Sequence, residues 1–347
     1  MPPPTGTQKV RNSSIELYRI IATFTVLAVH FNGWFVGGMP EKFDLANPTS
    51  FRTGQMIIEA VTCICVNMFL LISGYFGIRL KLSSVITLCM LLVLIYVPFY
   101  LLEVLLGTTF SMKVLISKFL VISNAGYFIQ DYVMLMFFSP VLNAFVKEYK
   151  KDILPWTITF LFIETWFGCI YVNDNFGFNK GYSIIHFVLI YMLARCIAMY
   201  KEKLLQMPRY AWLLGYLFST AIICLMYILG LQCAFDYSNP VVVFSSVCTF
   251  VPFLYKEWYS KLVNWIAGGT LAVYIIQVTS PVHPLLVKVD NYILEESPYP
   301  VYLIGVTIVI IVTFCFSILY HRMCTILTGT LMKKISPAIK GIEMSIC

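Results

Sequence analysis

The chain has 347 residues, of which 59% are hydrophobic and 12% charged, with a formal net charge of +7. Soluble domains carry about 25% charged residues, and the mean hydropathy here is +0.82. These values exclude an ordinary soluble domain and indicate a polytopic membrane protein. In such a protein the positive charge reports on membrane sidedness, so it does not indicate a nucleic-acid partner.

Ten apolar stretches recur along the chain, and a membrane-spanning helix needs about 20 such residues. They lie near 14–36, 54–77, 84–106, 126–147, 153–172, 182–200, 210–231, 239–255, 262–285 and 299–325. The stretch 111–123 is too short and too basic to span, and we expect an interfacial helix or a re-entrant turn there. The sequence therefore predicts an all-α integral membrane protein with about ten transmembrane helices.

Lys and Arg residues set the orientation, because the cytoplasmic loops of membrane proteins are enriched in them. With the N-terminus inside, six of the 24 fall outside, namely Lys42, Arg52, Lys113, Lys118, Lys180 and Lys288. The other 18 fall inside, so both termini are predicted to be cytoplasmic. We expect the protein to lie in the cell (inner) membrane. We expect a cytoplasmic tail at 1–13, one multi-span domain at 14–325 and a second cytoplasmic tail at 326–347.

The first span, which contains ELYRIIATFTVLAVH, carries Glu16 and Arg19 at its start and His30 at its end. Since each helical residue turns about 100° and rises about 1.5 Å, Arg19 and His30 share one face about 16 Å apart. Ionisable groups at this depth are costly and usually face a bundle interior or a wet cavity. One polar face therefore connects the two sides of the membrane. The alternative is that Arg19 reaches the interface and His30 is a packing residue.

Polar residues of the other spans form two sets. The outer half of the membrane holds His30, Glu59, Asp131, Glu164, His186 and Gln277. The inner face holds Arg11, Glu16, Arg19, Ser73, Arg79, Lys81 and Arg195. The inner cations suit phosphates, so an anionic cofactor docked inside could reach a base further out. For each residue alone, a structural hydrogen bond or an ordinary cytoplasmic charge is the alternative.

Four segments resemble the membrane-bound acyltransferase family 3. RNSSIELYRIIATFTVLAVH resembles the family's first helix, with an Arg and a His eleven positions apart. NMFLLISGYFGIRLK resembles its phenylalanine-rich segment, GYFIQDYVMLMFFSPVLN its aromatic helix leading to a proline, and GGTLAVYIIQ a late glycine-containing segment. Two departures stand out. Gln277 occupies a position that is often His in the family, and only Arg79 and Lys81 follow Ser-Gly-Tyr where the family has an Arg-rich run.

This resemblance implies O-acyl transfer, usually acetyl, from cytoplasmic acetyl-CoA to a carbohydrate hydroxyl. The implied acceptor is a surface polysaccharide or its lipid-linked precursor, and no metal is expected. A general base typically contributes about 10²–10⁴-fold, and His30 is the best candidate because imidazole titrates nearest neutrality. Glu59 is expected to orient His30. Direct transfer and a transient acyl-His30 both remain open.

The remaining predicted roles divide between the two substrates. The donor is expected to contact the residues Arg11, Arg19, Ser73, Tyr75, Arg79 and Lys81. The carbohydrate acceptor is expected to contact Asp131, Glu164, His186 and Gln277.

Other classes of membrane protein remain as alternatives. A transporter or glycan flippase would use Glu59, Glu164 and His30 as a proton relay, although no internal repeat typical of such carriers is visible. A polysaccharide polymerase should carry a large basic outer loop, and the longest outer loops here, 37–53, 107–125 and 286–298, are short.

Overall fold

A computed structural model describes residues 11–171 and 176–346 of the chain. These residues form helices joined by turns, with no strand among them. Eight helical segments are long and apolar enough to cross a membrane: Ser13–Val36, Ser50–Phe76, Leu82–Leu105, Tyr127–Glu148, Ile153–Ile170, Arg209–Ile228, Lys261–Val278 and Tyr299–Leu331. Two shorter apolar helices lie at Ile184–Met199 and Pro240–Leu254. The predicted all-α multi-span fold is confirmed, and the chain is a multi-pass membrane protein.

The helices group into two compact units. The first is built from the chain up to Ile78 and from Val141–Gly268, and the second from Arg79–Pro140 and the chain from Gly269 onward. Helix α7 (Tyr127–Glu148) contributes to both, because the division falls after Pro140, which lies inside it. That 14–325 acts as a single domain stays a prediction.

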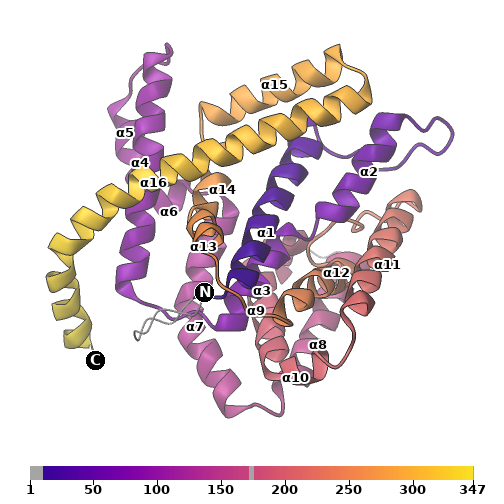
Figure 1. Ribbon diagram of the computed structural model, residues 1–347, viewed down its shortest axis with the longest axis horizontal. Coiled ribbons are helices and arrows are strands. Elements are labelled where there is room, and N and C mark those ends of the chain that lie inside the picture. The colour runs from indigo at the N-terminus through magenta and orange to yellow at the C-terminus, as the bar shows by residue number, and fades with distance from the viewer. Residues whose placement is uncertain (1–10, 172–175, 347) are drawn as a thin grey trace. The chain divides into compact units, whose positions relative to one another are not determined.

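The first unit holds the two histidines of the candidate site. Its elements are α1 (Ser13–Asn32), η1 (Trp34–Val36), α2 (Ser50–Thr62), α3 (Cys65–Phe76), α8 (Ile153–Thr165), η2 (Trp166–Ile170), η4 (Asn179–Gly181), α9 (Ile184–Met199), α10 (Lys201–Leu204), α11 (Arg209–Ile228), α12 (Pro240–Phe250), η5 (Val251–Leu254) and α13 (Lys261–Ala267). Helix α3 packs against α1, α9 and α12, and α11 runs beside α12 (Figure 1).

The contact between α3 and α9 depends on glycine. A Cβ added to Gly74 would lie 2.6 Å from Ala194 Cβ and 2.7 Å from the Tyr191 carbonyl oxygen. No larger residue fits at that separation, so the two helices meet backbone to backbone. This close approach fixes how the polar residues of α3 and α9 face one another.

Short polar residues start several helices of this unit by accepting a backbone N–H that has no partner inside the helix. Asn12 accepts from Ser14 at the start of α1, and Ser183 accepts from His186 at the start of α9. Asn239 caps α12 and is followed by Pro240 in the first turn, where a missing N–H costs nothing.

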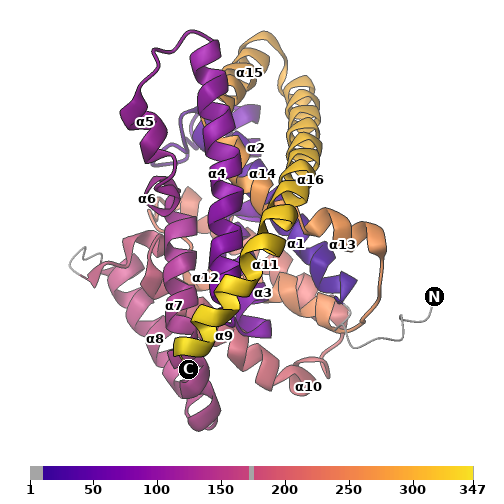
Figure 2. The same cartoon turned by 90° about the vertical axis from the view of Figure 1, so that its left-hand side faces the viewer.

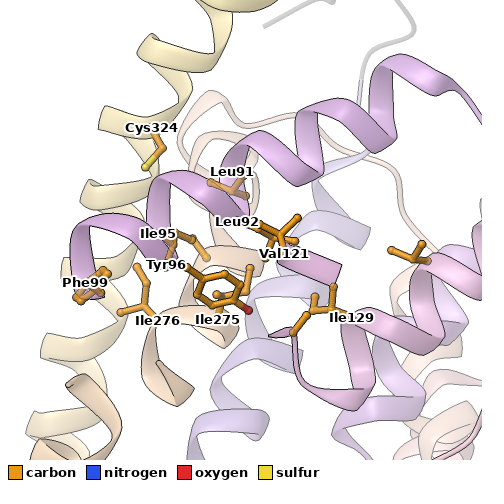
Figure 3. Packing of buried hydrophobic residues seen from close by; sticks show 13 residues of the cluster. Leu91, Leu92, Ile95, Tyr96, Phe99, Val121, Ile129, Ile275, Ile276 and Cys324 are labelled. Carbon is orange, nitrogen blue, oxygen red and sulfur yellow. The ribbon is translucent and has the colours of Figure 1, made fainter. Parts of the chain in front are cut away.

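The second unit contains α4 (Leu82–Leu105), α5 (Met112–Ser117), α6 (Val121–Asn124), α14 (Thr270–Val278), α15 (Val282–Glu296) and α16 (Tyr299–Ile346). Helices α4, α14 and α16 pack against one another (Figure 2). Their core is apolar, with Leu92, Ile95 and Ala272 fully buried beside Ile275 and Ile276 (Figure 3).

Some boundaries differ from those expected from the sequence. The second span consists of two helices, because Cys63 and Ile64 form a turn between α2 and α3. The ninth span ends at Val278, and Pro281 precedes a separate helix, α15, where 262–285 was expected as one span. The stretch 111–123 forms the short helices α5 and α6, and α16 continues through the expected tail 326–347 as far as Ile346.

Candidate active site

The N-terminal end of α1, predicted to be the inner one, carries one buried carboxylate between two guanidinium groups. Arg19 Nη1 lies 3.1 Å from Glu16 Oε2, and Arg11 Nε lies 3.9 Å from Glu16 Oε1. The Glu16 side chain is 8% exposed, against 27% for Arg19 and 58% for Arg11. One carboxylate cannot occupy the five N–H donors of each guanidinium. This end of the helix therefore keeps a surplus positive charge with free donor capacity.

The C-terminal end of α1, predicted to be the outer one, carries His30 in a half-buried position. Its ring meets the Trp34 ring edge-on at 5.2 Å between centroids, and the Phe35 ring lies at 6.0 Å. Both aromatic residues belong to η1, which directly follows α1 because Gly33 ends the helix. The imidazole thus stands against an aromatic wall while part of it remains exposed.

Glu59 of α2 lies close to the same end of α1, and its carboxylate is held by Asn32. Asn32 Nδ2 donates to Glu59 Oε2 at 2.8 Å and to the Gln55 carbonyl at 2.9 Å. Gln55 Nε2 donates back to the Asn32 carbonyl at 2.7 Å. Gly33 lies beside this pair, because a Cβ there would be in ordinary contact with Glu59 Oε2 at 3.4 Å. That Glu59 orients His30 stays a prediction; the hydrogen bond described for its carboxylate comes from Asn32.

Asn32 and Gln55 are functional candidates that sequence reasoning missed. Gln55 and Glu59 are four residues apart on α2, so they lie on one helix face. Arg52 extends that row, with Nη1 donating to Gln55 Oε1 at 2.7 Å. This spacing was the available signal; the pairing with Asn32 was not visible, because it joins two separate helices.

Glu164 and His186 form a fully buried chain with Asn67. His186 Nδ1 lies 3.1 Å from both carboxylate oxygens of Glu164, and His186 Nε2 lies 2.7 Å from Asn67 Oδ1. Asn67 Nδ2 donates to the Tyr237 carbonyl at 3.1 Å. The side chains of Glu164, His186 and Asn67 come from α8, α9 and α3 and are 0% exposed.

These partners determine the protons of the chain. Because Asn67 Nδ2 is used as a donor, its Oδ1 faces the imidazole and accepts, so His186 Nε2 carries a hydrogen. If neither Glu164 nor His186 Nδ1 carried a proton, the carboxylate and the ring nitrogen would repel each other, and a negative charge would be buried. One further proton therefore lies between Glu164 and His186 Nδ1, and the pair has no net charge. The polar atoms of Glu164 and His186 thus bond each other and do not face solvent.

The two predicted donor contacts Ser73 and Tyr75 lie at the C-terminal end of α3. Ser73 Oγ donates to the Phe69 carbonyl at 2.9 Å within the helix. The Tyr75 ring packs 5.5 Å from the Phe250 ring and is half-buried. Arg195 Nη1 donates to the Tyr75 carbonyl at 3.2 Å and so closes the helix end.

The other four predicted site residues belong to the second unit. Arg79 and Lys81 precede α4 and are exposed. Asp131 of α7 is half-buried. Gln277 of α14 is 0% exposed, and neither its Oε1 nor its Nε2 has a hydrogen-bond partner among the described residues. A buried amide of this kind calls for an explanation, and a ligand group is one.

Comparison with known proteins gives one match. The family model of an acyltransferase domain matches residues 12–322, which is nearly the whole chain. No curated protein and no solved structure matches the chain.

Proposed function

The chain belongs to the family of this acyltransferase domain, and from that premise we propose that it moves an acetyl group from acetyl-CoA to a carbohydrate hydroxyl. The proposed acceptor is a surface polysaccharide or its lipid-linked precursor, reached from within the bilayer. Membership of the family makes the protein an enzyme, which disfavours the transporter and flippase alternative.

The observation that supports this proposal most directly is the polar face of α1. Arg19 and His30 lie on that face, about 16 Å apart along the axis by helical geometry. The guanidinium is at the inner end, where Glu16 leaves donors unused. The imidazole is at the outer end and half-buried. A donor held by its phosphates at Arg19 would extend its thioester along α1 toward His30.

In the proposed reaction His30 acts as the general base. Its ring nitrogen takes the proton of the sugar hydroxyl while the hydroxyl oxygen attacks the thioester carbonyl carbon. The carbon–sulfur bond then breaks, and the thiolate of CoA leaves with the proton returned by the imidazolium. The aromatic wall of Trp34 and Phe35 excludes water from one side of the ring. This lowers competing hydrolysis of the thioester.

Glu59 and Asn32 support His30 in this proposal by fixing the end of α1. Asn32 is two residues after His30 and is bonded to both Glu59 and Gln55 of α2. The segment that carries the base is thereby tied to a second helix, which preserves its position during the reaction. A buried carboxylate so close to the site also favours the imidazolium formed on proton transfer.

The substrates are assigned to residues by charge and hydrogen-bonding capacity. We assign the phosphates of CoA to Arg11 and Arg19, with Ser73 and Tyr75 as polar contacts. That Arg79 and Lys81 also contact the donor stays a prediction from the sequence. That the acceptor contacts Asp131 and Gln277 stays a prediction from the sequence, and the unpartnered amide of Gln277 is compatible with a ligand group. The predicted contact of Glu164 and His186 with the sugar has less support, because their side chains bond each other.

The first test is donor binding and turnover by the purified protein in nanodiscs. Calorimetry with acetyl-CoA and release of the free CoA thiol are measured for wild type, Arg19→Ala and the matched control Arg209→Ala, an exposed arginine outside the site. We expect Arg19→Ala to weaken binding about tenfold or more, as expected for a lost charge-assisted contact, and Arg209→Ala to bind like wild type. Folded wild type that binds no acetyl-CoA would contradict the assignment of the donor.

A further inference from the structure

Two loops of the first unit pack together at the ends of α8 and α11. The loop at 229–239 follows α11, and the short elements η2 and η4 follow α8. The Tyr237 N–H donates to the Lys180 carbonyl at 3.1 Å, and the Tyr237 ring lies 4.9 Å from that of Tyr182. Gly181 (φ 90°) allows the approach, because a Cβ there would lie 2.6 Å from Tyr237 Cβ.

This loop contact brings two thiols together. Cys169 lies in η2 at the end of α8, and Cys233 lies in the loop after α11. Both are half-exposed and outside any disulfide, and their thiols lie close enough to interact. The neighbouring positions agree, because a Cβ added to Gly168 would lie 3.5 Å from Ser238 Oγ. The proposed acyl transfer does not use Cys169 or Cys233.

The chemistry of Cys233 suits thiol exchange. The hydrogen bond from Cys169 lowers the pKa of the Cys233 thiol, although burial and Asp236 oppose that effect. Lys180 lies close enough to favour the thiolate as well. The thiolate is the reactive form in disulfide exchange, and a second thiol in contact resolves the intermediate.

The charge pattern places this pair on the outer side of the membrane. Lys150 and Lys151 precede α8, and Arg209 begins α11, so the basic residues lie at the ends opposite the two cysteines. Cytoplasmic ends of membrane helices carry the excess of Lys and Arg. The outer side of a cell membrane is an oxidising compartment, where disulfides form and persist.

We propose that Cys169 and Cys233 form a disulfide by exchange with an external disulfide, either a small molecule or a thiol oxidoreductase. The Cys233 thiolate attacks one sulfur of the external disulfide and expels one thiolate. The Cys169 thiol then loses its proton and attacks Cys233, which expels the second thiolate. The two protein thiols are oxidised, and the external disulfide is reduced to two thiols.

The proposed disulfide would fix the loop 229–239, whose Tyr237 is hydrogen-bonded to the Asn67–His186–Glu164 chain. The Tyr237 carbonyl accepts the hydrogen bond of Asn67, whose other side-chain atom faces His186. Cys233 is four residues before Tyr237 in the same loop. Oxidation therefore ties the loop, through Cys169, to the end of the helix that carries Glu164.

The test uses the full chain in nanodiscs with oxidised glutathione as the oxidant. After treatment, free thiols are alkylated and peptides are mapped by mass spectrometry without reduction. We expect a linked peptide joining Cys169 to Cys233 in wild type and in the control Cys224→Ser, and none in Cys169→Ser or Cys233→Ser. The oxidised wild type should also melt about 5 °C or more above the reduced form, since the cross-link closes a long loop.

Two results would overturn the proposal. Both are measured on wild type, and the untreated sample serves as the control for folding. One is complete alkylation of both thiols after excess oxidised glutathione. The other is glutathione retained on Cys233 with Cys169 alkylated, which would show that the second thiol cannot reach. Neither result bears on acetyl-CoA turnover, so the acyl-transfer proposal is judged separately.

Discussion

Two histidines of the first unit are held in opposite ways. His186 has a partner at each ring nitrogen, and all three side chains of its chain are 0% exposed. His30 is half-buried, with aromatic rings on one side and a carboxylate–amide pair nearby. A general base must exchange its proton with the substrate. The partners at both ring nitrogens of His186 prevent such an exchange, whereas the partial exposure of His30 permits it. This contrast agrees with the proposal that His30 is the reacting group, and it predicts a structural role for His186.

The largest expected effect is on turnover at the open histidine. His30→Ala should lower the rate of acetyl transfer by about 10²–10⁴-fold, the contribution of a general base, while the melting temperature stays near that of wild type. The matched control is His283→Ala, another half-buried histidine with no role in the proposed reaction. Equal rates for His30→Ala and wild type in a direct transfer assay would remove the distinction between the two histidines.

The sealed histidine should instead control stability. His186→Ala leaves the Glu164 carboxyl buried without its partner, and breaking a buried pair in this way costs about 3–5 kcal/mol. Thermal unfolding in detergent measures this, with turnover compared only in the fraction that remains folded. If the His186→Ala protein kept its melting temperature but lost turnover, His186 would belong with His30 as a reacting group.

A smaller loss is expected at the amide that holds Glu59. Asn32→Ala removes the hydrogen bond to Glu59 Oε2, and an unsatisfied buried acceptor costs about 1–3 kcal/mol. The double variant Asn32→Ala with Glu59→Gln should recover part of that loss, because a neutral amide is less costly to bury than a carboxylate. Strictly additive losses in the two variants would show that Asn32 and Glu59 do not interact.

The smallest expected effect is the pH dependence of stability that comes from the buried carboxyl of Asp290. Asp290 of α15 is 0% exposed, and burial raises its pKa from 3.8 to about 7, with Tyr302 opposing the rise. The folded state therefore retains a proton that the unfolded chain has already released. Its stabilising contribution is complete below about pH 4 and is lost as the pH rises through about 7.

Thermal unfolding at pH 5 and pH 8 tests this for wild type and Asp290→Asn. Wild type should melt about 2–4 °C lower at pH 8, the shift expected from about 1 kcal/mol. Asp290→Asn should lose most of that difference. A wild-type melting temperature that rises from pH 5 to pH 8 would have the wrong sign for a buried acid.

Much of the fold follows from the sequence, because each span is an apolar run whose length matches the bilayer. The interruptions of helices within the spans could not be predicted from the sequence in the same way. The turn at Cys63 and Ile64 falls in an apolar stretch without Gly or Pro, so only its packing reveals it. The split after Val278 had a local signal, since Pro281 lacks the N–H that a continuing helix needs.

The candidate site could be predicted only where it lies within one helix. Arg19 and His30 share a face of α1 through their spacing alone. Glu164 and His186 were both assigned to the acceptor, because each is an ionisable group at membrane depth. That they meet depends on how α8 and α9 pack, which no local pattern encodes. The same holds for Asn32 with Glu59, and for Cys169 with Cys233.

The neutrality of the Glu164–His186 pair has an electrical consequence. A membrane voltage does work only on net charge that moves through it, about 2.3 kcal/mol per elementary charge per 100 mV across the whole membrane. A proton that shifts between Glu164 Oε1 and His186 Nδ1 moves across one 3.1 Å hydrogen bond, so the voltage barely acts on it. The buried chain should therefore hold the same structure in an energised cell and in a depolarised one. His30, which gains a whole charge when it accepts a proton, has no such protection.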